Sequence, residues 1–137
     1  MAKFVFTDAS LVVNSVDLSD HVESVTVAYN SDAVEDTAMG STARSYKPGL
    51  TDSTVQVTFF QDYASSKVDA TLFGLVGAAA TTLVIKPTSS SVGATNPSFT
   101  VSAILTDYSG PVDASVGDAA KASATFQCTV ALVRATS

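Results

Sequence analysis

The sequence predicts a mainly β protein: an antiparallel β-sandwich or barrel with one short α-helix packed on it and a long loop between two strands. The composition favours this class, because 19 Val and 17 Thr stand against only 2 Glu and 5 Lys. Val and Thr favour strands, whereas Glu and Lys are strong helix formers. Several segments also alternate apolar and polar residues with the two-residue period of a strand, and one segment has a helical period.

Length and composition predict a single domain over residues 1–137 with a thin hydrophobic core. The chain has the length of one domain and contains no internal repeat or linker. Apolar residues make up 46%, but most are small, with 20 Ala and 19 Val against 8 Leu, 2 Ile and no Trp. Side chains of this size fill a narrow space, such as that between two sheets or between a sheet and a helix.

Two strand patterns separated by a turn begin the chain. The first covers residues 9–16, the turn covers 14–19, and the second strand covers 22–29. Apolar residues alternate with polar or small ones in the second strand, so we expect it to bury one face. That face is expected to carry Val25, Val27 and Tyr29.

Residues 30–53 separate this strand from a third one over 54–60, and they have no regular period. Loops of this length are uncommon in compact domains and are usually functional or disordered. The segment carries large apolar residues that a disordered loop would lack, so it either covers the domain's own core as a flap or buries them on another copy. Its acidic and basic residues could pair within a hairpin or across a subunit boundary. The residues concerned are Val34, Glu35, Asp36, Met39, Arg44, Tyr46, Lys47 and Leu50.

The third strand is followed by the one segment with a helical period. Its apolar stripe consists of Val68, Leu72, Leu75 and Val76. This spacing predicts a helix of about three turns. Ser65 and Ser66 are positioned to cap its start, and Gly77 to end it.

The C-terminal part predicts three more strands. Residues 82–86 form the first, which Pro87 ends, and residues 99–106 form the second. The last strand has the cleanest alternation, with Ala122, Ala124, Phe126, Cys128 and Val130 on one face. Its other face is entirely polar, so we expect it to meet water or a wet lumen.

The charge balance argues against a nucleic-acid-binding protein. The net charge is −6, and 11 Asp residues supply nearly all of the acid. An acidic chain has no electrostatic footprint for phosphates, so the charge serves either solubility or a surface that repels a polyanion. No apolar run is long enough to span a membrane, so no membrane partner is expected. Met1–Phe4 lacks the apolar core of a signal peptide, and we expect synthesis in a cytoplasm without export.

The sequence contains no recognisable catalytic, metal or cofactor site. Asp17, Asp20 and the single histidine, His21, lie close together, but their spacing fits no metal-ligand pattern. A nucleophile elbow, a phosphate-binding loop and a dinucleotide glycine motif are all missing. The lone Cys128 falls on the expected buried face of the last strand. We therefore expect no enzyme and no cofactor, but a binding or structural module.

Several short stretches resemble the tail tube proteins of long-tailed phages, particularly of phages that infect actinobacteria. They run in order over most of the chain and comprise residues 36–40, 46–50, 60–63, 68–73, 96–99 and 116–118. This resemblance implies six-fold rings that stack into a hollow tube, with sheets of neighbouring subunits lining the lumen through which DNA leaves. It also implies that residues 30–53 are an arm that reaches an adjacent subunit or ring.

The resemblance further implies the partners and the place of the protein. Partners would be copies of the same chain together with tape measure, tail terminator and tail tip proteins, in a virion tail assembled in the host cytoplasm. Genomic DNA would pass without specific binding, because an acidic lumen offers no phosphate-binding sites. The candidate lumen residues are Asp17, Asp20, Asp52, Asp107, Asp113 and Asp118.

Two other classes of protein remain open from the sequence. One is another structural part of the same virion: a head–tail connector, a tail terminator or a capsid-decorating protein. The other is a ligand-binding β-sandwich, which would need exposed aromatic side chains on a concave face. Trp is absent and most Phe and Tyr residues fall on predicted core positions, which disfavours this second class.

Overall fold

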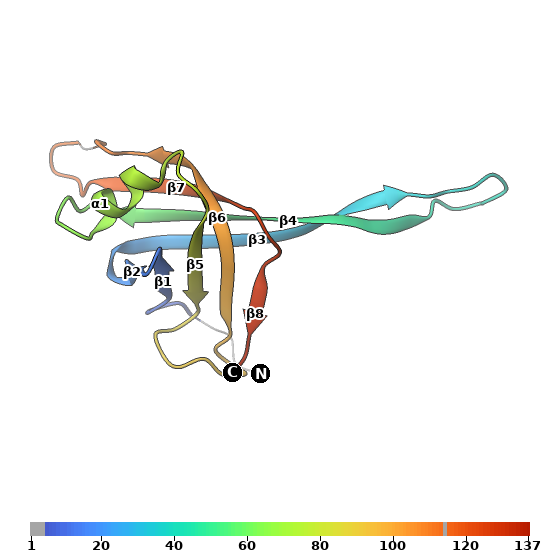
Figure 1. Cartoon of the computed structure of the whole chain (residues 1–137), viewed down its shortest axis with the longest axis horizontal. Helices are drawn as coiled ribbons and strands as arrows, with labels where there is room; N and C mark the ends of the chain where they lie inside the picture. Colours follow the sequence, from blue (N-terminus) through green and yellow to red (C-terminus); the bar gives the residue numbers. More distant parts are fainter. Residues whose placement is uncertain (1–4, 114) are drawn as a thin grey trace.

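One antiparallel β-sheet forms most of the molecule in a computed structural model that describes residues 5–113 and 115–137 (Figure 1). The strands are β1 (Ser10–Val13), β2 (Val16–Asp17), β3 (Val22–Glu35), β4 (Tyr46–Phe60), β5 (Thr81–Lys86), β6 (Ser98–Ser109), β7 (Lys121–Cys128) and β8 (Val133–Ala135). The helix α1 (Val68–Leu72) and the 3-10 turn η2 (Phe73–Leu75) lie between β4 and β5, and the 3-10 turn η1 (Ser19–His21) precedes β3. The predicted class, mainly β with one short helix, is confirmed. The expectation about export rested on Met1–Phe4, which lies outside the described residues.

The strands are arranged in the order β2-β1-β5-β6-β7-β4-β3, and β8 pairs with β6. The sheet is not closed into a barrel, so the barrel form of the prediction is not the one that the chain adopts. The short β2 stands at one edge and β3 at the other. Although β1 and β4 are far apart in this order, both contribute to one hydrophobic core, so the sheet bends around that core.

The core consists of alternate residues of five strands together with one face of α1. Leu18 and side chains from β1, β4, β5, β6, β7 and α1 belong to it. Its largest fully buried side chains are Phe59 and Phe126, and it also contains the small side chains of Ala103 and Ala124. The described core is thus built mainly from Leu and Val side chains.

The helix is shorter than its apolar stripe predicts. Val68 and Leu72 are buried as expected, but the α-helical part ends at Leu72 and continues as η2. The predicted serine cap is wrong, because Lys67 occupies the N-cap position without a side-chain hydrogen bond. The preceding turn is organised by Asp62 instead: its carboxylate accepts the Ala64 N–H at 2.9 Å and its carbonyl accepts the Asp69 N–H at 3.1 Å.

The segment over residues 30–53 is a hairpin arm and not the irregular loop that the sequence predicts. β3 and β4 pair along their whole length, from Val22 opposite Phe59 to Glu35 opposite Tyr46. Only residues 36–45 connect the two strands at the tip. A register shift between Ser31 and Ala33 accommodates Gly49, at which an added Cβ would lie 2.9 Å from a methyl group of Val34.

Some strand ends also differ from the prediction. The last long strand stops at Cys128, and Val130 is exposed rather than part of the buried face. Tyr29 is 51% exposed, because β3 has already left the core at this point. β8 was not predicted at all, since its three residues are too few to show a period.

Candidate functional site

The arm extends away from the body of the molecule, as the light-blue and teal strands of Figure 1 show. The large apolar side chains that the sequence singled out there are exposed: Val34 at 52%, Met39 at 103%, Tyr46 at 53% and Leu50 at 82%. The flap alternative is therefore wrong, because these side chains do not cover the protein's own core. A contiguous ribbon with this many exposed apolar residues is typical of an interaction surface.

Ion pairs cross the tip of the arm. The Nε of Arg44 lies 3.8 Å from a carboxylate oxygen of Glu35, and the Nζ of Lys47 lies 3.6 Å from one of Asp36. The hydroxyl of Thr37 also accepts the Ser45 N–H at 2.8 Å. Of the two pairing alternatives, the one within a hairpin is present. Exposed pairs of this kind contribute roughly 0–1 kcal/mol each, so they shape the tip more than they stabilise it.

Both edges of the arm lack a neighbouring strand among the described residues. β3 pairs only with β4, and β4 pairs with β7 only from Thr54 to Phe60. Isolated two-stranded ribbons are marginally stable in water, and open edges invite pairing with another chain. At the root of the arm the buried hydroxyl of Ser53 has no hydrogen-bond partner, and it lines a pocket of about 210 Å³ beside Cys128.

The outer side of four adjacent strands forms a mainly polar face, on which the register also places Ala28, Phe60 and Ile104. The strands β3, β4, β7 and β6 lie side by side in this order, and partners opposite each other in the register share a side of the sheet. None of the polar residues on this side is buried. They are Ser24, Thr26, Asn30, Asp52, Thr54, Gln56, Thr58, Asp107, Ser109, Ser123, Thr125 and Gln127. The sequence predicted the polar sides of the strands over 22–29 and 54–60 and of the last strand. Asn30, Asp52, Asp107 and Ser109 lie beyond the predicted strand ends, and the order of the strands was not predicted.

Two of the six acidic lumen candidates belong to this polar face. Asp107 lies opposite Thr125, and Asp52 accepts a hydrogen bond of 2.7 Å from the amide of Gln127. Lys121, at the end of the face, is paired with Glu23 at 3.0 Å. Asp52 and Asp107 thus lie on the same side of the sheet, on β4 and β6 with β7 between them, and they accept hydrogen bonds from Gln127 and Ser109 respectively.

The other four acidic candidates lie elsewhere. Asp17 shares the outer side of the sheet but stands on β2, at the far edge. The hydroxyl and the N–H of Ser19 donate to its carboxylate and lower its pKa below the usual value. Asp20 contacts His21.

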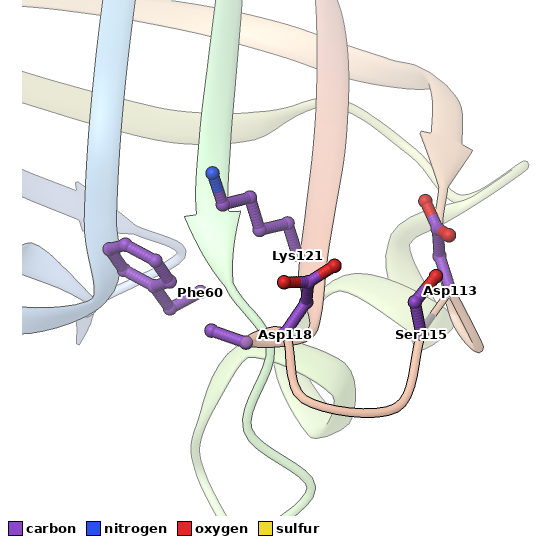
Figure 2. A pocket seen from close by; sticks show the side chains of 6 residues that line it. Phe60, Asp113, Ser115, Asp118 and Lys121 are labelled. Atoms are coloured by element: carbon purple, nitrogen blue, oxygen red, sulfur yellow. The ribbon is translucent and has the colours of Figure 1, made fainter.

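Asp113 and Asp118 lie on the loop between β6 and β7. Figure 2 shows them around an open pocket of about 480 Å³, together with Phe60 and Lys121. The Nζ of Lys121 lies 5.6 Å from the ring centroid of Phe60, and the two carboxylates are exposed. None of the described lining residues is a buried polar group that would define a ligand site.

The described residues contain no group of three or more His, Cys, Asp or Glu side chains placed to hold a metal ion. Asp17 binds Ser19 and not His21, so the cluster of acidic residues and histidine in the sequence is divided in space. Cys128 is buried on β7, which confirms its predicted place in the core. Over the part of the chain that the structure describes, no helix is long and apolar enough to cross a membrane.

The fold of the chain is that of solved tube and tube-terminator structures. No protein-family model and no curated protein sequence matches the chain. A sheath/tube terminator of the extracellular contractile injection system PVC matches with a TM-score of 0.75 and 14% identity, covering 98% of this chain and 97% of the other. The SPP1 tail tube matches at 0.72 and 11% identity over 95% and 77%, and the PVC sheath–tube complex at 0.70 and 14% over 94% and 88%.

Proposed function

We propose that this chain is a structural subunit that assembles with copies of itself into stacked hexameric rings and so forms the hollow tail tube of a phage or phage-like particle. The observation that carries the proposal is the arm, which holds exposed Val34, Met39, Tyr46 and Leu50 on a ribbon with two open edges. Covering such a ribbon requires a second chain. The fold, shared over nearly the whole chain with tube structures, supports the same role.

In this proposal the arm, residues 30–53, binds an adjacent subunit or ring. Its contact residues are Val34, Glu35, Asp36, Met39, Arg44, Tyr46, Lys47 and Leu50. The apolar members supply buried area, whereas the charged members, already paired across the hairpin, set the shape of the tip. The single domain over residues 1–137 would then be the repeating unit of the tube.

The polar face lines the lumen in this proposal. DNA moves along a surface without sticking when that surface holds no free cations to replace the counterions of the phosphates. Hydroxyls, amides and the carboxylates of Asp52 and Asp107 meet this requirement, and Lys121 is neutralised by Glu23. Among the acidic candidates we assign the lumen first to Asp52 and Asp107, while Asp17, Asp20, Asp113 and Asp118 remain secondary candidates.

The remaining partners follow from the role in a tail. A tube needs a tape measure protein inside it, a terminator at one end and tip proteins at the other, and genomic DNA passes through it. We place assembly in the host cytoplasm and the mature protein in the virion tail. The proposal involves no catalysis, no cofactor and no membrane.

A tail terminator is the second candidate, because a terminator structure matches this chain as well as the tube structures do. Connector and capsid-decorating roles have no comparable support. A terminator forms one ring and stops, whereas a tube protein continues to polymerise, so the product of assembly distinguishes them.

Negative-stain electron microscopy of the purified protein over a concentration series tests the proposal. Long hollow tubes of constant width are the expected result. Closed single rings at every concentration would instead support the terminator. If the protein stays monomeric, purified virions should contain it in many copies, and its absence from them would overturn a tail role.

A further inference from the structure

His21, the single histidine of the chain, lies between two carboxylates that come from different parts of the fold. Its Nδ1 is 2.7 Å from an oxygen of Asp20, and its Nε2 is 2.8 Å from an oxygen of Asp62. The imidazole is largely enclosed, with 17% of the side chain exposed. Both ring nitrogens are therefore committed to acidic partners.

The two contacts determine how many protons the imidazole must carry. An ionised carboxylate can only accept hydrogen bonds, so each ring nitrogen must donate. A neutral imidazole has one N–H and an imidazolium has two. The Asp62 carboxylate is ionised near neutral pH, because hydrogen bonds from the Ala64 N–H and from His21 lower its pKa. Both contacts are satisfied together only when His21 carries its second proton.

These contacts join two segments that are remote in the sequence. His21 is the last residue of η1, directly before β3, whereas Asp62 lies between β4 and α1. The carbonyl of Asp62 accepts the N–H of Asp69 in the first turn of α1. The imidazole thus connects the beginning of β3 to the turn that starts the helix, at the end of β3 opposite the arm.

We propose that His21 is a proton-dependent latch, which fastens the start of β3 to the turn before α1 when it is protonated and releases one of its two carboxylates when it is neutral. Histidine is the side chain whose ordinary change of charge falls nearest neutral pH, so an imidazole between two carboxylates is suited to such a switch. It stands apart from the arm and the polar face, and the inference does not depend on the tail-tube proposal.

Other charged groups near the latch act on it more weakly. Lys67 acts on both Asp62 and Asp17 through space. Asp17 is held by Ser19, Asp69 accepts a hydrogen bond from Tyr108, and Glu23 is paired with Lys121. Among the described residues, Asp20 and Asp62 are the charged groups within hydrogen-bond distance of the imidazole.

Nuclear magnetic resonance of the full-length protein tests the latch directly, because a single histidine gives one set of ring ¹⁵N signals. At about pH 5.5 both ring nitrogens should carry protons, and by about pH 8.5 one of them should have lost its proton. The amides of Ala64 and Asp69 should shift, and exchange with solvent faster, over the same pH range. In His21→Gln these amides should show no such step. One protonated nitrogen at every pH, or unresponsive amides, would overturn the proposal.

Unfolding in urea gives an independent readout. The urea midpoint of the wild type should exceed that of His21→Gln by more at about pH 5.5 than at about pH 8.5, because only the imidazolium holds both carboxylates. Lys121→Gln removes the Lys121–Glu23 ion pair without a histidine, and its difference from the wild type should be the same at both pH values. If His21→Gln behaves like Lys121→Gln, the imidazole is a static contact and not a latch.

Discussion

Phe126 is one of the two largest fully buried side chains of the described core. It lies on β7 opposite Val55 of β4, in the middle of the bent sheet. Phe126→Ala should lower the free energy of unfolding by about 3–5 kcal/mol, because it removes a buried aromatic side chain and leaves a cavity in the core. Urea unfolding measures this loss. Phe73→Ala, at a side chain that is 69% exposed, is the matched control and should change stability by no more than about 0.5 kcal/mol. Equal effects of the two substitutions would contradict the assignment of the core.

Tyr108 connects β6 to α1 through its hydroxyl, which donates to Asp69 and accepts from the amide of Gln61, both at 2.9 Å. Burial, with the Asp69 carboxylate, raises the pKa of the phenol to about 12. Since the folded state favours the neutral phenol, this stabilisation is fully present below about pH 10 and is lost as the pH rises through about 12.

An alkaline titration followed by tyrosinate absorbance, with circular dichroism to monitor folding, checks this prediction. The wild type should show an ionisation step near pH 12 that Tyr108→Phe lacks. Persistence of the step in Tyr108→Phe would contradict the assignment.

At the scale of elements, the two strands of the arm pair with each other but have few contacts with the rest of the sheet. β3 and β4 pair from one end to the other, with two register shifts, yet no described strand flanks either of them in the arm, on the tip side of Thr54. The double substitution Met39→Asp and Leu50→Asp should abolish assembly, because it places charge where another chain must bury apolar side chains. Sedimentation and electron microscopy measure the loss.

The same double variant should unfold at the wild-type urea concentration, because both side chains are exposed in the isolated subunit. Val116→Asp is the matched control: Val116 is also fully exposed, at 108%, but it lies on the loop between β6 and β7. Assembly should survive in this variant. Normal tubes from the arm variant would show that the arm is not an assembly element.

The arm also explains why its structure was missed. A strand in a one-sided sheet alternates apolar and polar residues because one face is buried. Both faces of the arm meet solvent in the subunit, so no alternation marks it, and Pro48 and Gly49 look like a turn. The sequence left open whether the charged residues pair within a hairpin or across a subunit boundary. Glu35 and Arg44 pair within the hairpin.

At the scale of the whole molecule, the polar face carries two acidic side chains, Asp52 and Asp107. Asp52→Lys together with Asp107→Lys should leave tubes intact, because both side chains are exposed on the outer side of the sheet. DNA release from particles built with this variant should slow, since the new cations bind phosphates. The paired Asn substitutions remove the charge without reversing it and should have a smaller effect. Release at the normal rate from the Lys variant would rule out this face as the lumen.

The sequence by itself determined what depends on neighbours along the chain. Alternation in residues 54–60 and 122–128 identified two core strands and their polar sides, and Gly77, with its positive φ, marked the end of the helical region. Composition favoured a β fold and argued against a charge suited to nucleic-acid binding. These properties depend on neighbouring residues or on composition, so the sequence shows them without knowledge of the tertiary contacts.

Only the tertiary structure decided which segments meet. Strand order joined four polar sides into one face, and it separated Asp52 and Asp107 from the other acidic candidates. It also placed Asp62 against His21, although 41 positions separate them in the sequence, which is farther than any periodic pattern reaches. Contacts of this kind depend on how the sheet bends around its core, and no sequence spacing encodes that bend.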